Sequence, residues 1–340
     1  MTGKELMTYT KIIAEAGVNH NGEMALAYRL IDAAVEAEVD VVKFQTYIAD
    51  EVMTDQTPLA DYMGDEEANF LDLARKLELS LSETLELKAY AEAKGIGFLS
   101  SPFDEPSVYA LQEIGLKELK IPSGETVNPF VMKAAAKSKL PLIVSTGMCD
   151  LEDLRWAISF LKEHDSGPVT LLHCTTQYPA VPENLNLKAM QTLATEFNLP
   201  VGYSDHSTGI EIPIAAVAMG ASVIEKHFTL DKTLAGPDHA ASLEPAELKA
   251  MVQAIRKVNV SLGTGIKKPF PIEVEVAAVA RKSLVLKADA KAGAVIDEST
   301  VTAKRPGTGI PAMDFAKFKG RRLKRDLAKN HILTAEDFTE

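Results

Sequence analysis

The stretch PVGYSDHSTGIEIPIAAVAMGASVIEKHFTL, residues 200–230, contains the pattern that decides the fold. Two of its segments, PVGYSDH (200–206) and SVIEKHFTL (222–230), begin apolar and end in polar side chains. The residues between these segments fit a single helix, so the stretch predicts a strand, a helix and a second strand.

This unit recurs along most of the chain. From residue 11 to about residue 262, short apolar strands alternate with helical patterns such as MALAYRLIDAAVEAE (24–38). Another helical pattern begins with a capping-box spacing, Ser80 to Glu83, and ends at Gly95, a natural left-handed stop. The eight predicted strands are 11–17, 39–47, 97–103, 118–124, 141–148, 169–175, 200–206 and 222–230.

Eight strands in alternation with helices fit either a closed parallel barrel or a large open doubly wound sheet. Almost every strand ends in a polar cluster, for example Glu15 or Ser100-Ser101, although polar groups in a buried strand are costly. Polar residues that merely begin a loop would explain one or two strands, but not eight. Polar groups repeated at the carboxyl ends of strands mark the catalytic face of a (β/α)₈ TIM barrel, so we predict that fold.

The composition is that of an ordinary globular protein, with 340 residues, 46% hydrophobic and 25% charged. A formal net charge of -12 argues against partners such as nucleic acid or an anionic membrane surface. The two cysteines, Cys149 and Cys174, are too few for a disulfide framework. The opening residues MTGKELMTYT lack the apolar stretch of an export signal, and no apolar run is long enough to span a bilayer. We therefore expect a cytoplasmic enzyme with reduced thiols.

The chain is too long for one typical domain, and its character changes near the end. After the last barrel helix (243–263), the Pro-punctuated stretch GIKKPFPIEVE (265–275) predicts a linker. We predict a catalytic barrel over 1–265, a linker over 266–281 and a small, mostly β domain over 282–340. Because a domain this small has no metal or disulfide staple, we expect it to dock on another surface.

The strongest local signal is a pair of histidines, His206 and His227, at the ends of consecutive predicted strands. Imidazole suits manganese, iron, cobalt or zinc, and two ligands leave open positions for water and substrate. A hydrogen-bonded structural histidine is the better explanation for His164 or His331, but the pair favours a metal site. His239 is either a further group at the rim or an exposed loop histidine.

A second set of residues at the strand ends could hold an anion. One lysine with a buried stem and several hydroxyl donors suits a phosphate monoester. Each serine taken singly is better explained as a cap of the following helix, but together with the lysine the set favours an anion site. No P-loop or Rossmann fingerprint is present, so a nucleotide cofactor is not indicated. The set comprises Lys120, Ser123, Ser101, Ser145 and Ser204.

Acidic residues supply candidate catalysts and hydrogen-bond acceptors for a polyol. Glu225 and Lys226 precede a candidate metal ligand, so one of the two side chains should point out of the barrel as packing. For the same reason His173 and Cys174 cannot both face the site, and we interpret Cys174 as a structural thiol. The candidate acids are Glu125, Glu225, Glu15, Asp205 and Asp238.

Nine motifs follow one another along the chain: GVNHNG (17–22), KFQTY (43–47), KIPSGE (120–125), STGM (145–148), HCTTQYPA (173–180), GYSDHSTG (202–209), EKHFTLDK (225–232), GPDHAASL (236–243) and KRPGTGI (304–310). In this order, and over nearly the whole chain, they resemble the sialic acid synthase family. The resemblance implies a TIM barrel followed by a small antifreeze-like (SAF) domain.

The resemblance also implies a reaction and an assembly. Enzymes of this kind condense phosphoenolpyruvate with an N-acetylated aldose, giving a nine-carbon 2-keto sugar acid and phosphate. The metal, Mn²⁺ or Mg²⁺, polarises the aldehyde, C3 of phosphoenolpyruvate attacks, water captures C2, and phosphate leaves by C–O cleavage. The implied assembly is a domain-swapped homodimer, in which the small domain of one chain covers the barrel mouth of the other.

The resemblance carries over residue by residue. His206 and His227 match the metal ligands, and Glu225 is a candidate to position the water. Arg305 matches the arginine that reaches the acetamido group of the sugar in the other subunit. The phosphoenolpyruvate binders are matched by Lys120, Ser123, Ser101, Ser145 and Ser204, with Tyr178 close by, and the sugar-binding or catalytic groups by Gln45, Lys43, Glu125, Glu225, Asp238 and Glu15.

One position separates the members of the family. Thr176 stands where neuraminate-forming members usually carry asparagine, and this resembles the bacterial legionaminate synthases. Their aldose, 2,4-diacetamido-2,4,6-trideoxymannose, carries a methyl group that favours apolar contacts. Neuraminate synthesis from N-acetylmannosamine and pseudaminate synthesis are the alternatives within the family.

Two alternatives come from other classes. A barrel metallohydrolase would need an H-x-H pair on the first strand, where this chain has Glu15 and Ala16. A non-enzymatic carbohydrate- or ice-binding module on an inert barrel is disfavoured by the polar strand ends.

Overall fold

The computed structural model describes residues 9–58 and 70–339. The chain forms two compact units, Met1–Thr264 and Gly265–Glu340. The opening residues MTGKELMTYT were predicted to lack an export signal. Residues 1–8 of this stretch lie outside the described part. None of the helices in the described ranges combines the length and the apolar character needed to cross a membrane.

The N-terminal unit contains one sheet of eight parallel strands, in the order β3-β2-β1-β8-β7-β6-β5-β4. The two strands at the ends of this order, β3 and β4, lie side by side, so the sheet curls into a nearly closed barrel. All eight predicted strands and the predicted TIM barrel are therefore confirmed. The strands are β1 (Lys11–Gly17), β2 (Val41–Thr46), β3 (Gly97–Pro102), β4 (Leu119–Ile121), β5 (Leu142–Ser145), β6 (Val169–Cys174), β7 (Val201–Asp205) and β8 (Val223–His227).

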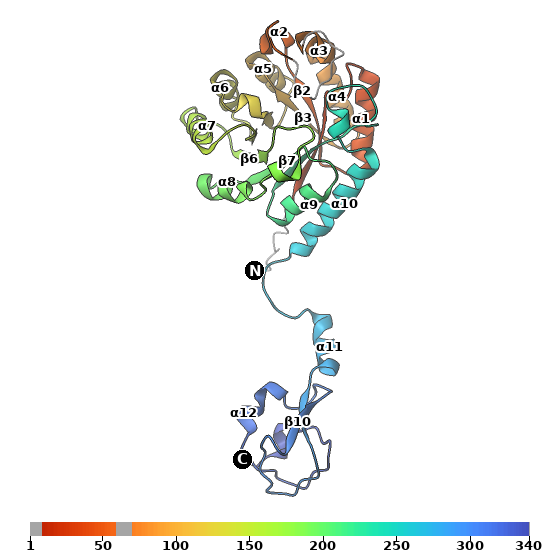
Figure 1. The fold of residues 1–340 in the computed structure, drawn as a ribbon, viewed down its shortest axis with the longest axis vertical. Helices are drawn as coiled ribbons and strands as arrows, with labels where there is room; N and C mark the ends of the chain where they lie inside the picture. The colour runs from red at the N-terminus through yellow and green to blue at the C-terminus, as the bar shows by residue number, and fades with distance from the viewer. Residues whose placement is uncertain (1–8, 59–69, 340) are drawn as a thin grey trace. The chain divides into compact units, whose positions relative to one another are not determined.

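Helices surround the strands in a ring (Figure 1). The predicted capping box is present at the start of α4, where Ser80 Oγ accepts a hydrogen bond from the Glu83 amide, and Gly95 after that helix has φ +81°. The helices of this unit are α1 (Met24–Glu36), α2 (Ala49–Val52), α3 (Phe70–Leu77), α4 (Leu81–Ala93), α5 (Glu105–Glu113), α6 (Pro129–Lys137), α7 (Leu151–Glu163), α8 (Ala189–Phe197), α9 (Glu211–Ala218) and α10 (Pro245–Leu262).

Apolar side chains fill the barrel in two places. The larger core lies between the outer faces of the strands and the helices, where Ile12, Leu30 and Leu111 are fully buried. The smaller core plugs the interior of the barrel. Because successive side chains of a strand point to opposite faces, the inward-facing polar residues lie above this plug, at the carboxyl ends. The plug consists of Ile13, Val41, Leu99, Ile143, Leu172 and Val223.

The C-terminal unit is small and contains an antiparallel pair, β9 (Ser283–Leu286) and β10 (Val301–Lys304), with the short helix α12 (Phe315–Phe318). Its own core includes the fully buried Leu286, Ile296 and Leu333. Part of the segment predicted as a linker forms a helix, α11 (Pro271–Ala280). Proline fits the first turn of a helix, and the Glu273 carboxylate accepts from the Phe270 amide, so the prolines here begin a helix rather than prevent one.

Candidate active site

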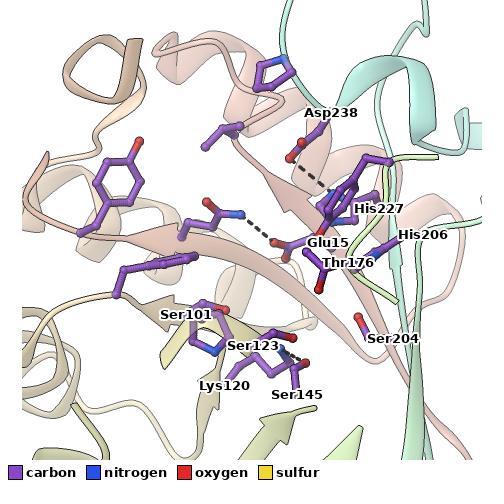
Figure 2. A pocket seen from close by; sticks show the side chains of 18 of the residues that line it. Glu15, Ser101, Lys120, Ser123, Ser145, Thr176, Ser204, His206, His227 and Asp238 are labelled. Atoms are coloured by element: carbon purple, nitrogen blue, oxygen red, sulfur yellow. Dashed lines mark hydrogen bonds and ion pairs between the residues drawn. The ribbon is translucent and has the colours of Figure 1, made fainter. Parts of the chain in front are cut away.

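A cavity of about 280 Å³ opens at the carboxyl ends of the strands (Figure 2). One side of it is polar and the other is apolar. The structure brings nearly all the sequence-predicted site residues into its lining: Glu15, Lys43, Gln45, Ser101, Lys120, Ser123, Ser145, Thr176, Tyr178, Ser204, His206, Glu225, His227 and Asp238.

The anion-binding candidates lie together at one end of the polar side. The buried Lys120 ammonium donates to Ser145 Oγ at 2.7 Å, and the Gly147 amide donates to Ser123 Oγ at 3.0 Å. The Ser145 and Ser123 hydroxyls therefore each accept a hydrogen bond from another group at this end of the cavity. Burial lowers the pKa of Lys120, because the charged form loses its hydration. A bound dianion would stabilise the charged form of the lysine, so this end of the cavity suits a phosphate group.

Two buried carboxylates lie between the lysines. Lys43 Nζ is 2.7 Å from Glu15 Oε2 and 3.9 Å from Glu225, while Lys120 Nζ is 3.5 Å from Glu225, which also accepts from Ser204 Oγ at 3.1 Å. Burial raises the pKa of Glu15 to about 7 against the opposing effect of Lys43. Burial would also raise the pKa of Glu225, but Lys120 and Lys43 outweigh it and hold that pKa below its ordinary value. The two carboxyl groups thus differ in protonation near neutral pH, which suits different acid–base roles.

The two histidine rings meet edge to face with their centroids 5.5 Å apart, and Tyr178 stacks on His206 with a centroid distance of 4.2 Å. The His206 Nδ1 atom lies 2.7 Å from the Thr175 carbonyl oxygen. Because a carbonyl only accepts, Nδ1 carries the hydrogen and Nε2 keeps its lone pair, as in metal-binding histidines. Burial lowers the pKa of His206 to about 4 and lowers that of His227 as well, so both rings are neutral at pH 7.

These residues fit a divalent metal ion. The buried Nδ1 of His227 has no hydrogen-bond partner, and it lies 3.6 Å from the carboxylate of Asp238 (Figure 2). Burial raises the pKa of Asp238 to about 6. In the described parts of the chain no group of three or more His, Cys, Asp or Glu side chains forms a metal cluster. The protein thus offers two imidazoles, and water and substrate would supply the other ligands, as at a catalytic metal.

The apolar side of the cavity was missed by sequence reasoning. Its residues come from α2, α3 and the loops after β1, β2 and β3, and all of them except Phe70 belong to a separate small core. No single motif connects them, because they converge only when the barrel closes. The local signals were Val18, in the motif GVNHNG, and Tyr47, the last residue of the KFQTY motif. We call this surface the apolar wall: Val18, Tyr47, Val52, Met53, Phe70, Leu73, Ala74, Leu77 and Phe103.

His173, Cys174 and His239 lie in different positions relative to the cavity. His173 points away from the site and bonds through Nε2 to the Leu185 carbonyl oxygen at 2.7 Å, whereas Cys174 lines the cavity, which confirms that the two side chains face opposite ways. The expectation of a structural thiol did not foresee this cavity position. His239 is fully buried, and its two ring nitrogens contact Thr229 and Asn21. It is therefore not the exposed loop histidine expected as one alternative, because its loop packs against the loop after β1.

Among the candidate acids, Asp205 does not line the cavity, because its buried carboxylate points to the outer face of β7 and pairs with Lys226. Glu125 and Arg305 also lie outside the cavity lining. Glu125 is half-buried after β4, and its carboxylate accepts from the Asn128 side chain at 2.6 Å. Burial raises the pKa of Glu125. Arg305 belongs to the C-terminal unit, where its Nε donates to the Ala280 carbonyl oxygen at 3.0 Å. Their roles at the site remain predictions.

A TIM barrel with a polar cavity at the carboxyl ends of its strands is typical of an enzyme. Comparison with known proteins identifies its family. Residues 30–267 match the NeuB family, and residues 281–339 match the SAF domain. This chain belongs to the NeuB family. Its membership argues against both the barrel metallohydrolase and the inert barrel, and it confirms the sialic acid synthase resemblance.

Individual relatives cover almost the whole chain. It is 47% identical to N,N'-diacetyllegionaminic acid synthase of Legionella pneumophila, over 96% of this chain and 93% of the relative. It is 46% identical to the protein of that name from Campylobacter jejuni, over 96% and 99%. Among solved structures, N-acetylneuraminic acid synthetase of Leptospira borgpetersenii, in complex with citrate, has a TM-score of 0.72 and 39% identity, and the match covers 81% of this chain and 94% of that one.

Proposed function

We propose that this enzyme condenses phosphoenolpyruvate, water and 2,4-diacetamido-2,4,6-trideoxymannose to give phosphate and a nine-carbon 2-keto acid of the legionaminate type. The single observation that carries this proposal is the cavity with a phosphate-type end, a pair of neutral histidines and an apolar wall. Names of relatives at 46–47% identity support the choice of sugar.

The apolar wall is the structural argument for a deoxy sugar. A hydrophobic surface gains free energy by covering a methyl group, but it leaves a buried hydroxyl without a partner. The C6 methyl group and the acetamido methyl groups fit such a wall better than the hydroxymethyl group of N-acetylmannosamine does. Thr176, the position at which the sequence resembles the legionaminate synthases, also lies in the cavity lining. Neuraminate and pseudaminate synthesis are the alternatives that the assay below tests.

The residues of the chain take these roles in the proposed reaction. Lys120, Ser123 and Ser145 bind the phosphate of phosphoenolpyruvate, together with Ser101 and Ser204. Tyr178, which stacks on His206, lies close to the phosphoenolpyruvate. Gln45, Lys43 and Asp238 hold the sugar. The substrates are thereby held close together and oriented, which is a large part of the catalysis of a two-substrate condensation.

The protons that move in the reaction indicate a role for each of the two buried carboxyl groups, Glu15 and Glu225. C3 of phosphoenolpyruvate forms a bond to the aldehyde carbon, and the aldehyde oxygen takes up a proton. Glu15 is the group that can hold this proton near neutral pH. Water then adds to C2 and loses one proton toward Glu225. When the C2–O bond to phosphate breaks, the remaining C2 hydroxyl becomes the ketone and its proton leaves with the phosphate. Bound by His206 and His227, a divalent ion, Mn²⁺ or Mg²⁺, would supply Lewis-acid polarisation of the aldehyde.

We further propose that the protein works in the cytoplasm as a domain-swapped homodimer. In this arrangement Arg305 of one chain would reach the sugar at the other chain's barrel. The exposed apolar side chains of α11, such as Ile272, Val276 and Val279, support an association of this kind, since apolar surface on this scale favours burial. Gel filtration with light scattering tests the dimer, and Arg305→Ala should raise the KM for the sugar.

The test of the proposed function is phosphate release from phosphoenolpyruvate with Mn²⁺ and each candidate sugar in parallel. We expect the highest kcat/KM with the diacetamido sugar. A preference for N-acetylmannosamine would make the enzyme a neuraminate synthase. If no phosphate is released with either sugar, the proposed acceptor sugar is refuted. His206→Ala should abolish turnover, whereas the matched control His164→Ala, at the end of α7, should leave it intact.

A further inference from the structure

Two charged residues lie on the outer face of the strands that carry the histidines. Asp205 directly precedes His206, and Lys226 directly precedes His227. Because side chains alternate along a strand, the histidines face the cavity and the charged residues face away from it. The ladder between β7 and β8 pairs Asp205 with Lys226, so the two charges are direct neighbours.

The two side chains form an ion pair with no exposed surface. Lys226 Nζ lies 2.6 Å from Asp205 Oδ2. The other carboxylate oxygen accepts from the Ser207 amide at 3.1 Å and from Ser207 Oγ at 2.8 Å. Lys226 also donates to the Ser207 carbonyl oxygen. The pair therefore holds the residues on both sides of His206, and it does so from a residue adjacent to His227.

Stability alone does not explain such a pair. Burying two charges costs several kcal/mol of desolvation per ion, and well-packed apolar residues are often as stable or more so. Apolar contacts, however, are non-directional, whereas charged hydrogen bonds fix distances and angles. The specific property of this pair is therefore the geometric restraint that it places on the ends of β7 and β8.

The restraint acts on the carboxyl ends of β7 and β8, where the histidines contact the cavity on one side. On the cavity side His227 Nδ1 has no hydrogen-bond partner, and both histidines line the cavity. The His206 ring is oriented by the Thr175 carbonyl, and the His206 carbonyl oxygen accepts from the Ala180 amide. The ion pair links the segment around His206 to the strand of His227 through two fully buried side chains, in addition to the hydrogen bond from Ser204 to Glu225 on the cavity side of the same strands.

We propose that Asp205 and Lys226 are positioning residues, which preset the separation of His206 and His227 for a divalent cation. This inference rests on the metal site of the proposed function. The pair touches neither metal nor substrate, and it acts by keeping the two imidazoles in place before the cation arrives. Loss of such supporting contacts typically weakens metal binding 10- to 100-fold.

The test uses the full-length double variant Asp205→Asn/Lys226→Met. Asparagine keeps the acceptor for Ser207, methionine keeps the volume of the lysine stem, and no buried charge is left unpaired. Lys226→Met alone would leave the Asp205 charge buried without a partner, and it would destabilise the barrel for that reason. Isothermal titration of the metal-free protein with Mn²⁺ should show a Kd raised about 10- to 100-fold. Circular dichroism and the binding of phosphoenolpyruvate without metal should stay as in the wild type.

The matched control is Asp40→Asn/Arg256→Met. These residues form an ion pair of 2.7 Å next to the start of β2, at the opposite end of the barrel. This variant should lose stability and keep the wild-type Kd for Mn²⁺. A folded Asp205→Asn/Lys226→Met protein with a Kd within twofold of the wild type would overturn the positioning role. A wild-type protein that binds no Mn²⁺ would overturn the metal site together with this inference, so the two failures are distinguishable.

Discussion

The burial of Asp238 gives a sharp prediction about stability and pH. Its carboxyl group lies in the cavity wall, where burial raises its pKa from 3.8 to about 6. Asp238→Asn keeps the shape of the side chain and removes the charge. In metal-free protein, we expect the variant to become more stable than the wild type as the pH rises, because the asparagine never has to ionise in a buried place.

The sign and size follow from proton linkage. A folded-state pKa above the unfolded one means that the folded protein binds more protons, so the wild type loses stability as the pH rises from about 4 to about 6. A rise from 3.8 to about 6 corresponds to about 3 kcal/mol, at about 1.4 kcal/mol per pH unit. About half of this penalty is present at pH 5 and nearly all of it at pH 7.5. The gap between variant and wild type should therefore widen by about 1.5 kcal/mol over that range.

The assay is urea unfolding at pH 5 and pH 7.5 with EDTA present. The chain has one tryptophan, Trp156 on α7, so its fluorescence follows the barrel rather than the C-terminal unit. Asp165→Asn is a control without a pH effect in this range, because Lys139 holds the pKa of the exposed Asp165 below its ordinary value of 3.8. Asp165 is therefore ionised in both the folded and the unfolded protein from pH 5 upward, and the gap between this variant and the wild type should be equal at the two pH values. A gap between Asp238→Asn and the wild type that is equal at both pH values would refute the reasoning.

Three further predictions concern the anion site and a helix end. A Cβ atom on Gly147 would lie 2.3 Å from Thr176 Oγ1 and 2.8 Å from Ser123 Oγ, so Gly147→Ala should displace these groups and lower kcat/KM for phosphoenolpyruvate roughly 100-fold; unchanged kinetics would contradict this. Lys120→Met removes the buried ammonium and should raise the KM for phosphoenolpyruvate roughly 10- to 100-fold, with Lys120→Arg as the charge-keeping comparison. Ser80→Ala removes the cap of α4 and should cost about 1 kcal/mol in urea unfolding with phosphate release unchanged, so a loss of activity would show that this helix end affects the site.

Local patterns in the sequence were sufficient for the fold. The alternation of apolar strands with helical periods depends on residues near one another in the chain, and so does the Ser80 capping box. The polar ends of the strands predicted the face of the barrel that carries the site. His206 and His227 could be paired from sequence because consecutive parallel strands of a barrel lie side by side.

The chemistry within the site required the tertiary structure. The tautomer of His206 depends on the Thr175 carbonyl, 31 positions away in the chain. The opposite pKa changes of Glu15 and Glu225 depend on burial and on lysines from other strands. Sequence reasoning proposed both acids but could not assign them different states, because electrostatic effects of this kind are set by distance and solvent exposure.

The outer face of the barrel shows the same division. The sequence predicted that either Glu225 or Lys226 would point outward as packing, which follows from the two-residue period of a strand. Only the structure showed that Lys226 does so, in a fully buried ion pair with Asp205. The apolar wall likewise gathers side chains from α2, α3 and three loops. Periodicity decides which way a side chain faces along its own element, but the neighbours it meets are decided by how the elements pack together.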